Sequence, residues 1–77
     1  PALLDAIDAD LADEAPEVQW AMNFCAAWIG VHDVPHRERV VEIGERIGLY
    51  REEKMVRGCT PNYLPAFIEI EAAKAGK

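Results

Sequence analysis

The stretch "PEVQWAMNFCAAWIGV", residues 16–31, decides the fold, because it is apolar on almost every side of a helix. Pro16 suits the first helical turn, where an amide hydrogen has no helical partner, and Glu17 is favourable at the positive end of the helix. The segment therefore predicts a helix from Pro16 to Val31. A helix that is apolar nearly all round is normally covered by neighbours on several sides, so we expect this one to be central.

Two apolar stripes run along this expected helix. The first stripe consists of Val18, Ala21, Met22, Cys25 and Ile29. The second consists of Trp20, Phe24, Ala27, Trp28 and Val31. A narrow seam of small or polar residues interrupts them, made of Gln19, Asn23, Ala26 and Gly30. We expect neighbouring helices to cover such a helix on several sides.

The flanking segments predict two more helices. Apolar residues at helical spacing predict a first helix that ends near Ala15, before Pro16: Leu3, Leu4, Ile7 and Leu11. Asp33 can cap a third helix that has Pro35 in its first turn. One face of that helix carries His36, Val40, Ile43, Gly44 and Ile47. Glu42 and Arg46 have the spacing of a helical ion pair, and Gly48 predicts a left-handed helix end.

A connection over residues 49–62 leads to a last helix. Thr60 or Asn62 can cap this helix, Pro65 suits its first turn, and the apolar periodicity continues to Ala75. No segment alternates as a strand does. The sequence therefore predicts an all-α fold of about four helices, arranged as the antiparallel helix pairs of an α-solenoid.

Length and composition limit the chain to one small domain. It has 77 residues, 51% of them hydrophobic, which excludes a disordered chain. Two cysteines do not make a disulfide-rich secreted scaffold, and no apolar stretch reaches the roughly 20 residues that span a membrane. We therefore expect a cytoplasmic location and no membrane partner. Because the chain opens with Pro1, either a methionine was removed or residues 1–77 are a piece of a longer helical protein.

The charge is unevenly distributed. No Lys or Arg precedes Arg37, whereas six of the eight basic residues lie between Arg37 and Arg57. The net charge of −6 argues against this chain holding nucleic acid by itself, because phosphate contacts need a basic surface.

The sequence predicts no catalytic, metal or cofactor site. Cys25, His32, His36 and Cys59 are possible zinc ligands, but their spacing does not fit the close pairs of structural sites. Cys59 has no flanking pattern that would position a base. We predict that Cys25 is buried in the apolar stripe and that Cys59 is partly accessible.

The aromatic residues of the central helix have two interpretations. Trp20, Phe24 and Trp28 lie at positions i, i+4 and i+8, on one helical side. Such a stripe can stack on nucleobases, but in most helices it belongs to the core. Spacing alone does not separate the two interpretations, and we favour core.

Three segments resemble the C-terminal part of the bacterial DNA alkylation repair family: "EVQWAMNFCAAWIG" (17–30), "RERVVEIGERIGLYRE" (37–52) and "RGCTPNYLPAFI" (57–68). The resemblance extends from about Leu3 to Glu71. It implies HEAT-like repeats in an ARM-type superhelix. The family's characterised members are glycosylases that remove alkylated purines, but their catalytic aspartate lies in middle repeats that have no counterpart here.

The resemblance also implies a DNA-facing surface. In the family stretch that matches Gln19 to Phe24, a lysine and a tryptophan face DNA; here Trp20 stands in place of the lysine and Phe24 in place of the tryptophan. The residues implied to face DNA are Asn23, Phe24, Arg37 and Arg57. The expected function is therefore a non-catalytic C-terminal repeat segment that completes the solenoid and contributes to DNA contact.

An alternative function is a helical module that binds a protein partner through an exposed apolar face. The two stripes of the central helix offer more apolar surface than three other helices cover. Upstream repeats or a second copy of the chain would cover the remainder. We therefore expect the isolated chain to self-associate, most simply as a symmetric dimer.

Overall fold

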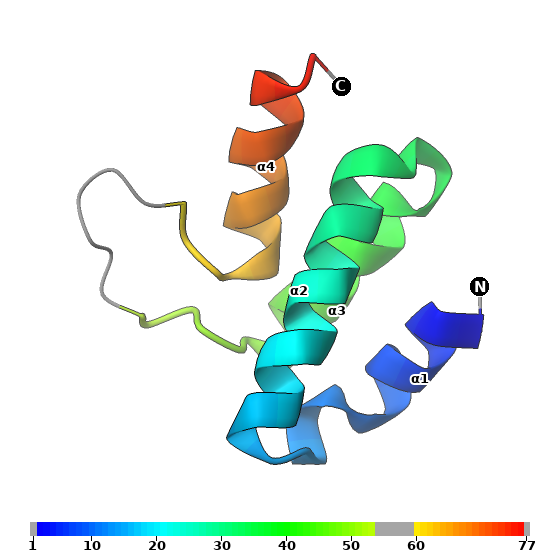
Figure 1. Cartoon of the computed structure of the whole chain (residues 1–77), viewed down its shortest axis with the longest axis vertical. Coiled ribbons are helices and arrows are strands. Elements are labelled where there is room, and N and C mark those ends of the chain that lie inside the picture. Colours follow the sequence, from blue (N-terminus) through cyan, green and yellow to red (C-terminus); the bar gives the residue numbers. More distant parts are fainter. Residues whose placement is uncertain (1, 54–59, 77) are drawn as a thin grey trace.

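The computed structural model describes residues 2–53 and 60–76, and all regular structure in these ranges is helical (Figure 1). The α-helices are α1 (Ala2–Asp10), α2 (Pro16–His32), α3 (Arg37–Ile47) and α4 (Leu64–Lys74). Short 3-10 turns, η1 (Leu11–Asp13) and η2 (Val34–His36), precede α2 and α3. The predicted all-α class with four helices is confirmed.

Proline fixes the start of α2 as the sequence predicts. Ala15, the residue before Pro16, is extended, with φ −62° and ψ 151°. Its carbonyl accepts hydrogen bonds from the amides of Val18 (2.9 Å) and Gln19 (2.8 Å). Pro16 has no amide hydrogen that would need a partner in the first turn. The helix begins without a side-chain cap.

The first helix is shorter than predicted. The α-helix ends at Asp10 rather than near Ala15, and the 3-10 turn η1 follows it. The tighter turn accompanies a fully buried Leu11, whose carbonyl accepts a hydrogen bond from Nε2 of Gln19 at 3.0 Å. A side chain of α2 therefore satisfies a carbonyl that a longer α1 would have paired internally.

The start of α3 also differs from the prediction, whereas its end agrees. The Asp33 side chain makes no capping hydrogen bond; its Oδ2 lies 2.8 Å from Nδ1 of His36 instead. Pro35 lies in the 3-10 turn η2, before α3 begins. Gly48 ends the helix at φ 72°, and its amide donates to the carbonyl of Gly44 at 2.9 Å.

Neither predicted cap of the last helix is used. α4 begins at Leu64 with Pro65 in its first turn, as expected, but no side chain caps it. The Thr60 hydroxyl donates instead to Oε2 of Glu71 (2.9 Å). Nδ2 of Asn62 donates to Oε1 of Glu53 (2.8 Å). Both predicted caps were wrong because these side chains bind carboxylates of other segments.

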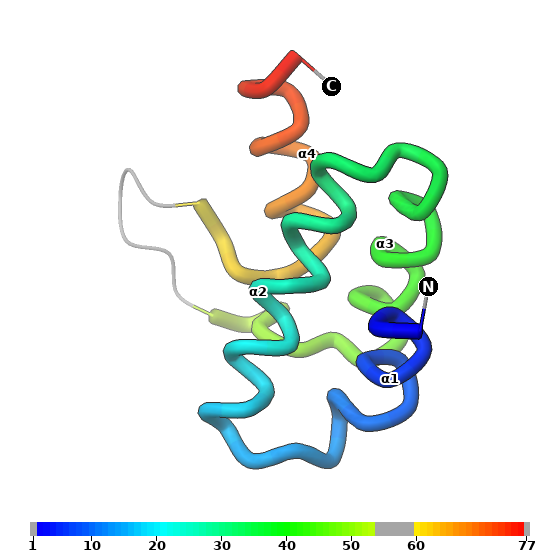
Figure 2. The backbone as a smooth tube through the Cα atoms, turned by 45° about the vertical axis from the view of Figure 1, so that its right-hand side comes forward, coloured from blue at the N-terminus to red at the C-terminus, as the bar shows by residue number. Residues whose placement is uncertain are grey.

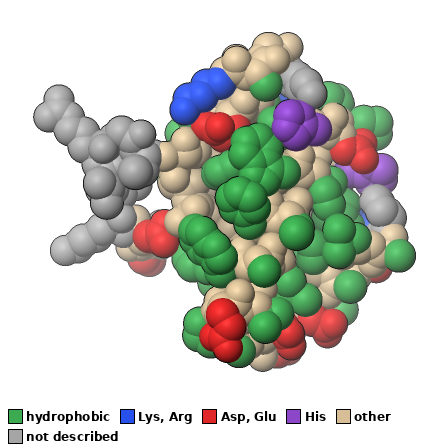
Figure 3. All heavy atoms as spheres, viewed as in Figure 1, with side chains coloured by type: hydrophobic (Ala, Val, Ile, Leu, Met, Phe, Trp, Pro, Cys, Tyr) green, Lys and Arg blue, Asp and Glu red, His purple; other side chains and the backbone are tan. Residues whose placement is uncertain are grey.

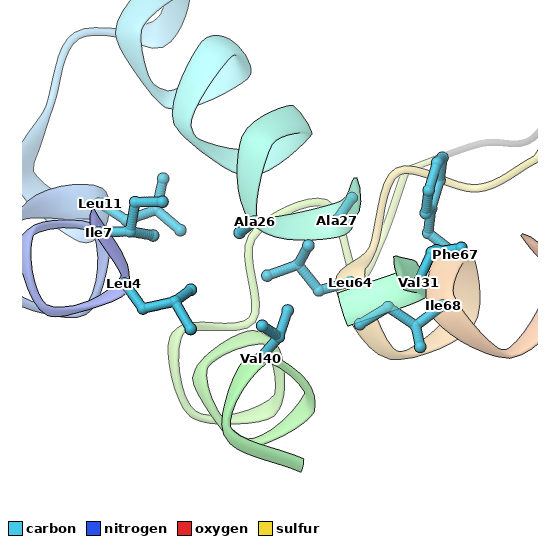
Figure 4. Close-up of a cluster of buried hydrophobic side chains, with 10 residues drawn as sticks. All are labelled: Leu4, Ile7, Leu11, Ala26, Ala27, Val31, Val40, Leu64, Phe67 and Ile68. Carbon is cyan, nitrogen blue, oxygen red and sulfur yellow. The ribbon is translucent and has the colours of Figure 1, made fainter. Parts of the chain in front are cut away.

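The helices form a flat body of 30 × 29 × 18 Å. α2 and α3 run side by side in opposite directions, and α4 and α1 lie on different sides of this pair (Figures 1 and 2). Figure 4 shows the core between them, with Leu64 of α4 pointing between Ala26 of α2 and Val40 of α3. The arrangement is compact, and these four helices do not by themselves show a solenoid.

The inward face of α2 consists of residues from the seam together with Ala27 and Val31 of the second apolar stripe. Asn23, Ala26 and Gly30 are all buried. Gly30 lets Ile68 of α4 and Val40 of α3 approach the α2 backbone. Because small residues allow close helix packing, the seam lies in the core and much of both apolar stripes is left outside.

In the part of the chain that the structure describes, no helix combines the length and the apolar character needed to cross a membrane.

Candidate functional site: the outer face of α2

The outer face of α2 is an apolar helix surface that the other described elements cover only in part. We define it by Trp20, Ala21, Phe24, Cys25, Trp28, Ile29 and His32, each exposed or half-buried. No Asp, Glu, Lys or Arg occurs in the chain between Glu17 and Asp33. Figure 3 shows the hydrophobic side chains gathered over α2, with acidic side chains at the lower edge. An uncharged helix side of this length is unusual on a free surface.

A row of rings runs along this face. Trp20 and Phe24 stack at 6.4 Å between ring centres, and Phe24 meets Trp28 edge-on at 6.1 Å. Trp28 then stacks on His32 at 5.4 Å, with 14° between the ring planes. Pairs of aromatic rings in such arrangements contribute about 0.5–1.5 kcal/mol beyond their buried area, so these contacts favour the observed arrangement of the row.

Rings from two other segments flank the row. Tyr50, in the turn after α3, meets Trp20 edge-on at 6.2 Å, and Phe67 of α4 meets Trp28 edge-on at 5.4 Å. Burial and the nearby charge of Glu53 raise the pKa of the Tyr50 hydroxyl. The row therefore has a carboxylate close to one side.

An open apolar hollow of about 800 Å³ lies at the C-terminal end of the face. Leu3 of α1 and Val34 of η2 stand at its rim, 53% and 56% exposed. The remaining lining residues are Cys25, Trp28, Ile29, His32, Asp33 and Pro35. The hollow can accept a bulky apolar group. The sequence contains one indication of an exposed apolar side chain here. Leu3 and Leu4 are adjacent in a helix, and two adjacent helical residues cannot both face the core fully.

The predicted burial of this face was wrong at several positions. Trp20 and Phe24 are 48% and 47% exposed, so the core interpretation of the aromatic stripe does not hold for them. Trp28 is half-buried against α4. Cys25 is exposed rather than buried, because the seam of α2 takes the core position. Cys59 lies outside the described residues.

Of the residues implied to face DNA that the structure describes, Phe24 is exposed, Arg37 is half-buried and Asn23 is buried. Asn23 is 4% exposed, and its Nδ2 donates to the carbonyl of Asn62 at 2.9 Å, so it ties α2 to the segment before α4. Its Oδ1 is buried without a hydrogen-bond partner. Arg57 lies outside the described residues. That these residues contact DNA remains a prediction.

Arg37, the remaining candidate, serves the end of α2. Its Nε donates to the carbonyl of Gly30 (2.8 Å) and its Nη2 to the carbonyl of Val31 (2.9 Å). Carbonyls in the last turn of a helix have no helical partner, and a cation is favourable at that negative end. The guanidinium therefore has a structural role in this chain.

Other arginines bind carboxylates of their own chain. Nη2 of Arg39 lies 2.7 Å from Oδ1 of Asp5, and Arg46 binds both Asp8 and Glu42, the latter at 2.9 Å as predicted. Hydrogen bonding to Arg46 holds the pKa of Asp8 below its ordinary value. The pairs with Asp5 and Asp8 join α1 to α3, and the pair with Glu42 lies within α3, so these arginines are paired with carboxylates.

Arg51 is also directed at its own chain. It donates to the carbonyl of Glu45 at 2.7 Å and to the hydroxyl of Tyr63 at 3.3 Å. Its guanidinium carbon lies 5.4 Å from the centre of the Tyr63 ring. Hydrogen bonding to Tyr63 raises the pKa of Arg51.

Carboxylates collect where α2 begins. Glu17 is in its first turn, and the residues just before the helix include Asp10, Asp13 and Glu14. All four side chains are exposed or half-buried. The outer face of α2 therefore starts at an acidic end of the molecule and finishes near Asp33.

Within residues 2–53 and 60–76, no three His, Cys, Asp or Glu side chains are grouped closely enough to hold a metal ion.

Comparisons with protein-family models, with curated proteins and with solved structures found no match to this chain. The resemblance to the DNA alkylation repair family therefore remains a prediction from sequence.

Proposed function

We propose that this chain is a non-catalytic helical module that binds a protein partner through the outer face of α2. The observation that carries the proposal is the uncharged helix side, on which Trp20 and Phe24 stay about half exposed. Contiguous apolar patches of this kind mark interaction surfaces, and tryptophan is enriched among the residues that dominate binding energy. Ring contacts already order the row, so binding costs little side-chain entropy.

A helical-repeat arrangement is compatible with this function. In α-solenoids, helix pairs stack so that each pair covers the apolar side of the next. The antiparallel α2–α3 pair, with an apolar side left open, supports the proposal that further helices stack on α2.

A second candidate is DNA contact within a DNA alkylation repair-like protein. It is favoured by the exposed ring of Phe24, at the position where the resemblance places the family's DNA-facing tryptophan. The net charge of −6 and the internal use of Arg37, Arg39 and Arg46 weigh against contact by this chain alone. In this candidate, basic surface must come from elsewhere, and the isolated chain has no glycosylase activity.

Tryptophan fluorescence tests the two candidates directly. The chain has two tryptophans, and both lie on the outer face of α2, so their emission reports this surface specifically. We expect an uncharged amphipathic helical peptide to shift the emission to shorter wavelength, and a short DNA duplex to leave it unchanged. A shift with duplex and none with peptide would reverse the order of the candidates.

A matched pair of variants locates the binding. Ala21→Arg places a charge on the outer face, one turn after Glu17, where Ala21 is exposed, and should abolish the peptide-induced shift. Ala73→Arg makes the same change at an exposed position of α4 and should leave the shift intact. Equal effects of the two variants would mean that the peptide does not bind to α2.

A further inference from the structure

The outer face of α2 has the dimensions of a helix-binding site. From Glu17 to Asp33 the helix advances about 24 Å at about 1.5 Å per residue. Over this distance the surface is apolar and carries ordered rings, and its far end opens into the hollow between Leu3 and Val34. A partner helix of about four turns presents anchors at positions i, i+3, i+4 and i+7 over the same length.

Both ends of the face carry negative charge. Glu17 stands at one end, with Asp10, Asp13 and Glu14 shortly before it in the chain, and Asp33 lines the hollow at the other. Oδ2 of Asp33 also lies 2.8 Å from Nδ1 of His36. No Lys or Arg side chain is among the described residues that line the hollow.

Most of the described cations are already paired with carboxylates of their own chain, whereas Arg37 binds carbonyls and keeps its charge at the C-terminal end of α2. Arg39 and Arg46 bind carboxylates of α1, Arg37 binds carbonyls of α2, and Lys74 lies 3.0 Å from Oε2 of Glu71. The surface that a partner meets is therefore apolar along its length, with a cluster of carboxylates at the N-terminal end of α2 and the single carboxylate of Asp33 at the other end.

We propose that the partner of this face is a basic amphipathic helix, with apolar anchors along α2 and Lys or Arg side chains over the carboxylates at its two ends. This inference rests on the proposed function of the same face and adds the chemistry of the partner. One bulky anchor enters the hollow beside Trp28. Complementary charge speeds association and fixes the direction in which the partner helix lies.

The charge disfavours other occupants. A second copy of this chain brings the same net charge of −6 and the same acidic end. Nucleic acid and anionic membrane surfaces are repelled by it. A basic helix is the occupant that meets both the apolar length and the acidic ends.

Three peptides of about 16 residues with one common apolar face test the inference. The first has Lys at both ends, the second Glu, and the third Gln; each is dye-labelled and titrated with the full chain by fluorescence anisotropy. We expect the Lys peptide to bind at least ten-fold more tightly than the Glu peptide at low salt, with the Gln peptide between them. Added salt should reduce the difference, since it screens exposed charges.

Matched protein variants identify the carboxylates. The double variant Glu14→Gln, Glu17→Gln should bind the Lys peptide several-fold more weakly than the unmodified chain does. Its affinity for the Gln peptide should be unchanged. Glu38→Gln with Glu45→Gln removes the same charge from exposed positions of α3 and should leave the preference for the Lys peptide in place.

The outcomes separate the inference from the function on which it rests. Equal affinity for all three peptides would overturn the basic partner and keep the docking face. Failure of every peptide to bind, with no difference between Ala21→Arg and the unmodified chain, would overturn the proposed function itself. A dimer of the chain that no peptide displaces would make a second copy the occupant and overturn the inference.

Discussion

Two glycines stand at the positions where neighbouring helices come too close for a side chain. A Cβ at Gly30 would lie 2.9 Å from Cγ1 of Ile68. A Cβ at Gly44 would lie 2.6 Å from Cβ of Leu64 and 2.7 Å from Cδ of Pro65. The atoms that block Gly30 belong to a side chain that can rotate. Those that block Gly44 are fixed to the backbone and to a ring.

This difference predicts how the two glycines respond to substitution. Alanine gains about 1 kcal/mol of helix propensity over glycine, whereas overpacking a core costs about 1–3 kcal/mol. Gly44→Ala should therefore lower the free energy of unfolding in denaturant, and Leu64→Ala should not relieve it, because the Cβ remains. Gly30→Ala should be relieved by Ile68→Ala. A Gly44→Ala variant more stable than the unmodified chain would show that α3 and α4 can separate at little cost.

The exposed thiol of Cys25 supplies a second prediction. In a Cys59→Ser variant, Cys25 should react with a thiol reagent in the folded protein nearly as fast as in the unfolded chain, because it lies on the open face of α2. Saturation with the Lys-ended peptide should slow the reaction. Slow labelling without peptide would mean that something already covers the face.

At the scale of elements, helix limits set by local chemistry were predicted well. Pro16 and Pro65 restrict the backbone of their own turn, and Gly48 takes a positive φ that most other residues avoid. These effects depend on the local backbone alone and not on the rest of the fold. Side-chain caps were predicted poorly. Asp33 and Thr60 found partners in His36 and Glu71, and periodicity does not reveal such contacts.

The orientation of α2 shows why apolar content is a weaker guide than shape. Large apolar residues were expected to face inward, yet Ala26 and Gly30 do so, since close approach lets Ile68 and Leu64 bury their side chains fully. A helix with apolar residues on most sides has several inward orientations of similar transfer free energy. Packing against the neighbouring helices α3 and α4 then determines which side of α2 faces inward. That packing geometry cannot be derived from the sequence alone.

The junction of α1 with α3 yields a prediction about pH. Hydrogen bonds from Arg46 and Arg39 lower the pKa of Asp8 from its ordinary value of 3.8. A carboxyl whose pKa is lower in the folded state stabilises the fold above its unfolded pKa and loses this effect as pH falls through the folded pKa. Asp8→Asn should therefore lower the thermal midpoint at neutral pH and have no effect well below pH 3.8.

The control for this prediction lies on the same helix. Asp10→Asn removes an exposed carboxylate from α1 without touching the ion pairs with Arg39 and Arg46. Its midpoint should stay close to that of the unmodified chain at both pH values. An equal loss in the two variants would assign the effect to net charge rather than to the junction.

At the scale of the whole molecule, the sequence predicted excess apolar surface but not its place. The charge-free run from Val18 to Val31 already exceeded what three other helices cover. The sequence indicated at most that Leu3 would be exposed; the hollow itself could not be predicted, because Leu3, Trp28 and Val34 meet only once α1 and η2 are placed around α2. The resemblance implied that Phe24 faces DNA; the structure shows that its side chain is 47% exposed, and the contact with DNA remains a prediction.

We expect the isolated chain to self-associate through the outer face of α2. The dependence of this association on salt tests whether repulsion between the two negatively charged copies limits it. Without a partner, the outer faces of two copies can cover each other, but each copy carries a net charge of −6. Salt shortens the Debye length from about 10 Å at 0.1 M to about 3 Å at 1 M, so added salt should strengthen the dimer in sedimentation at micromolar concentration. Added salt should instead weaken the binding of the Lys-ended peptide to the chain. At low salt, this peptide should dissociate the dimer by taking the place of the second copy. Ala21→Arg should leave the chain a monomer at every salt concentration. Phe24→Ala should weaken the dimer. It should also cost less stability than truncating a core side chain, because about half of the Phe24 side chain is already exposed. A dimer that survives Ala21→Arg would place the contact on another face of the molecule.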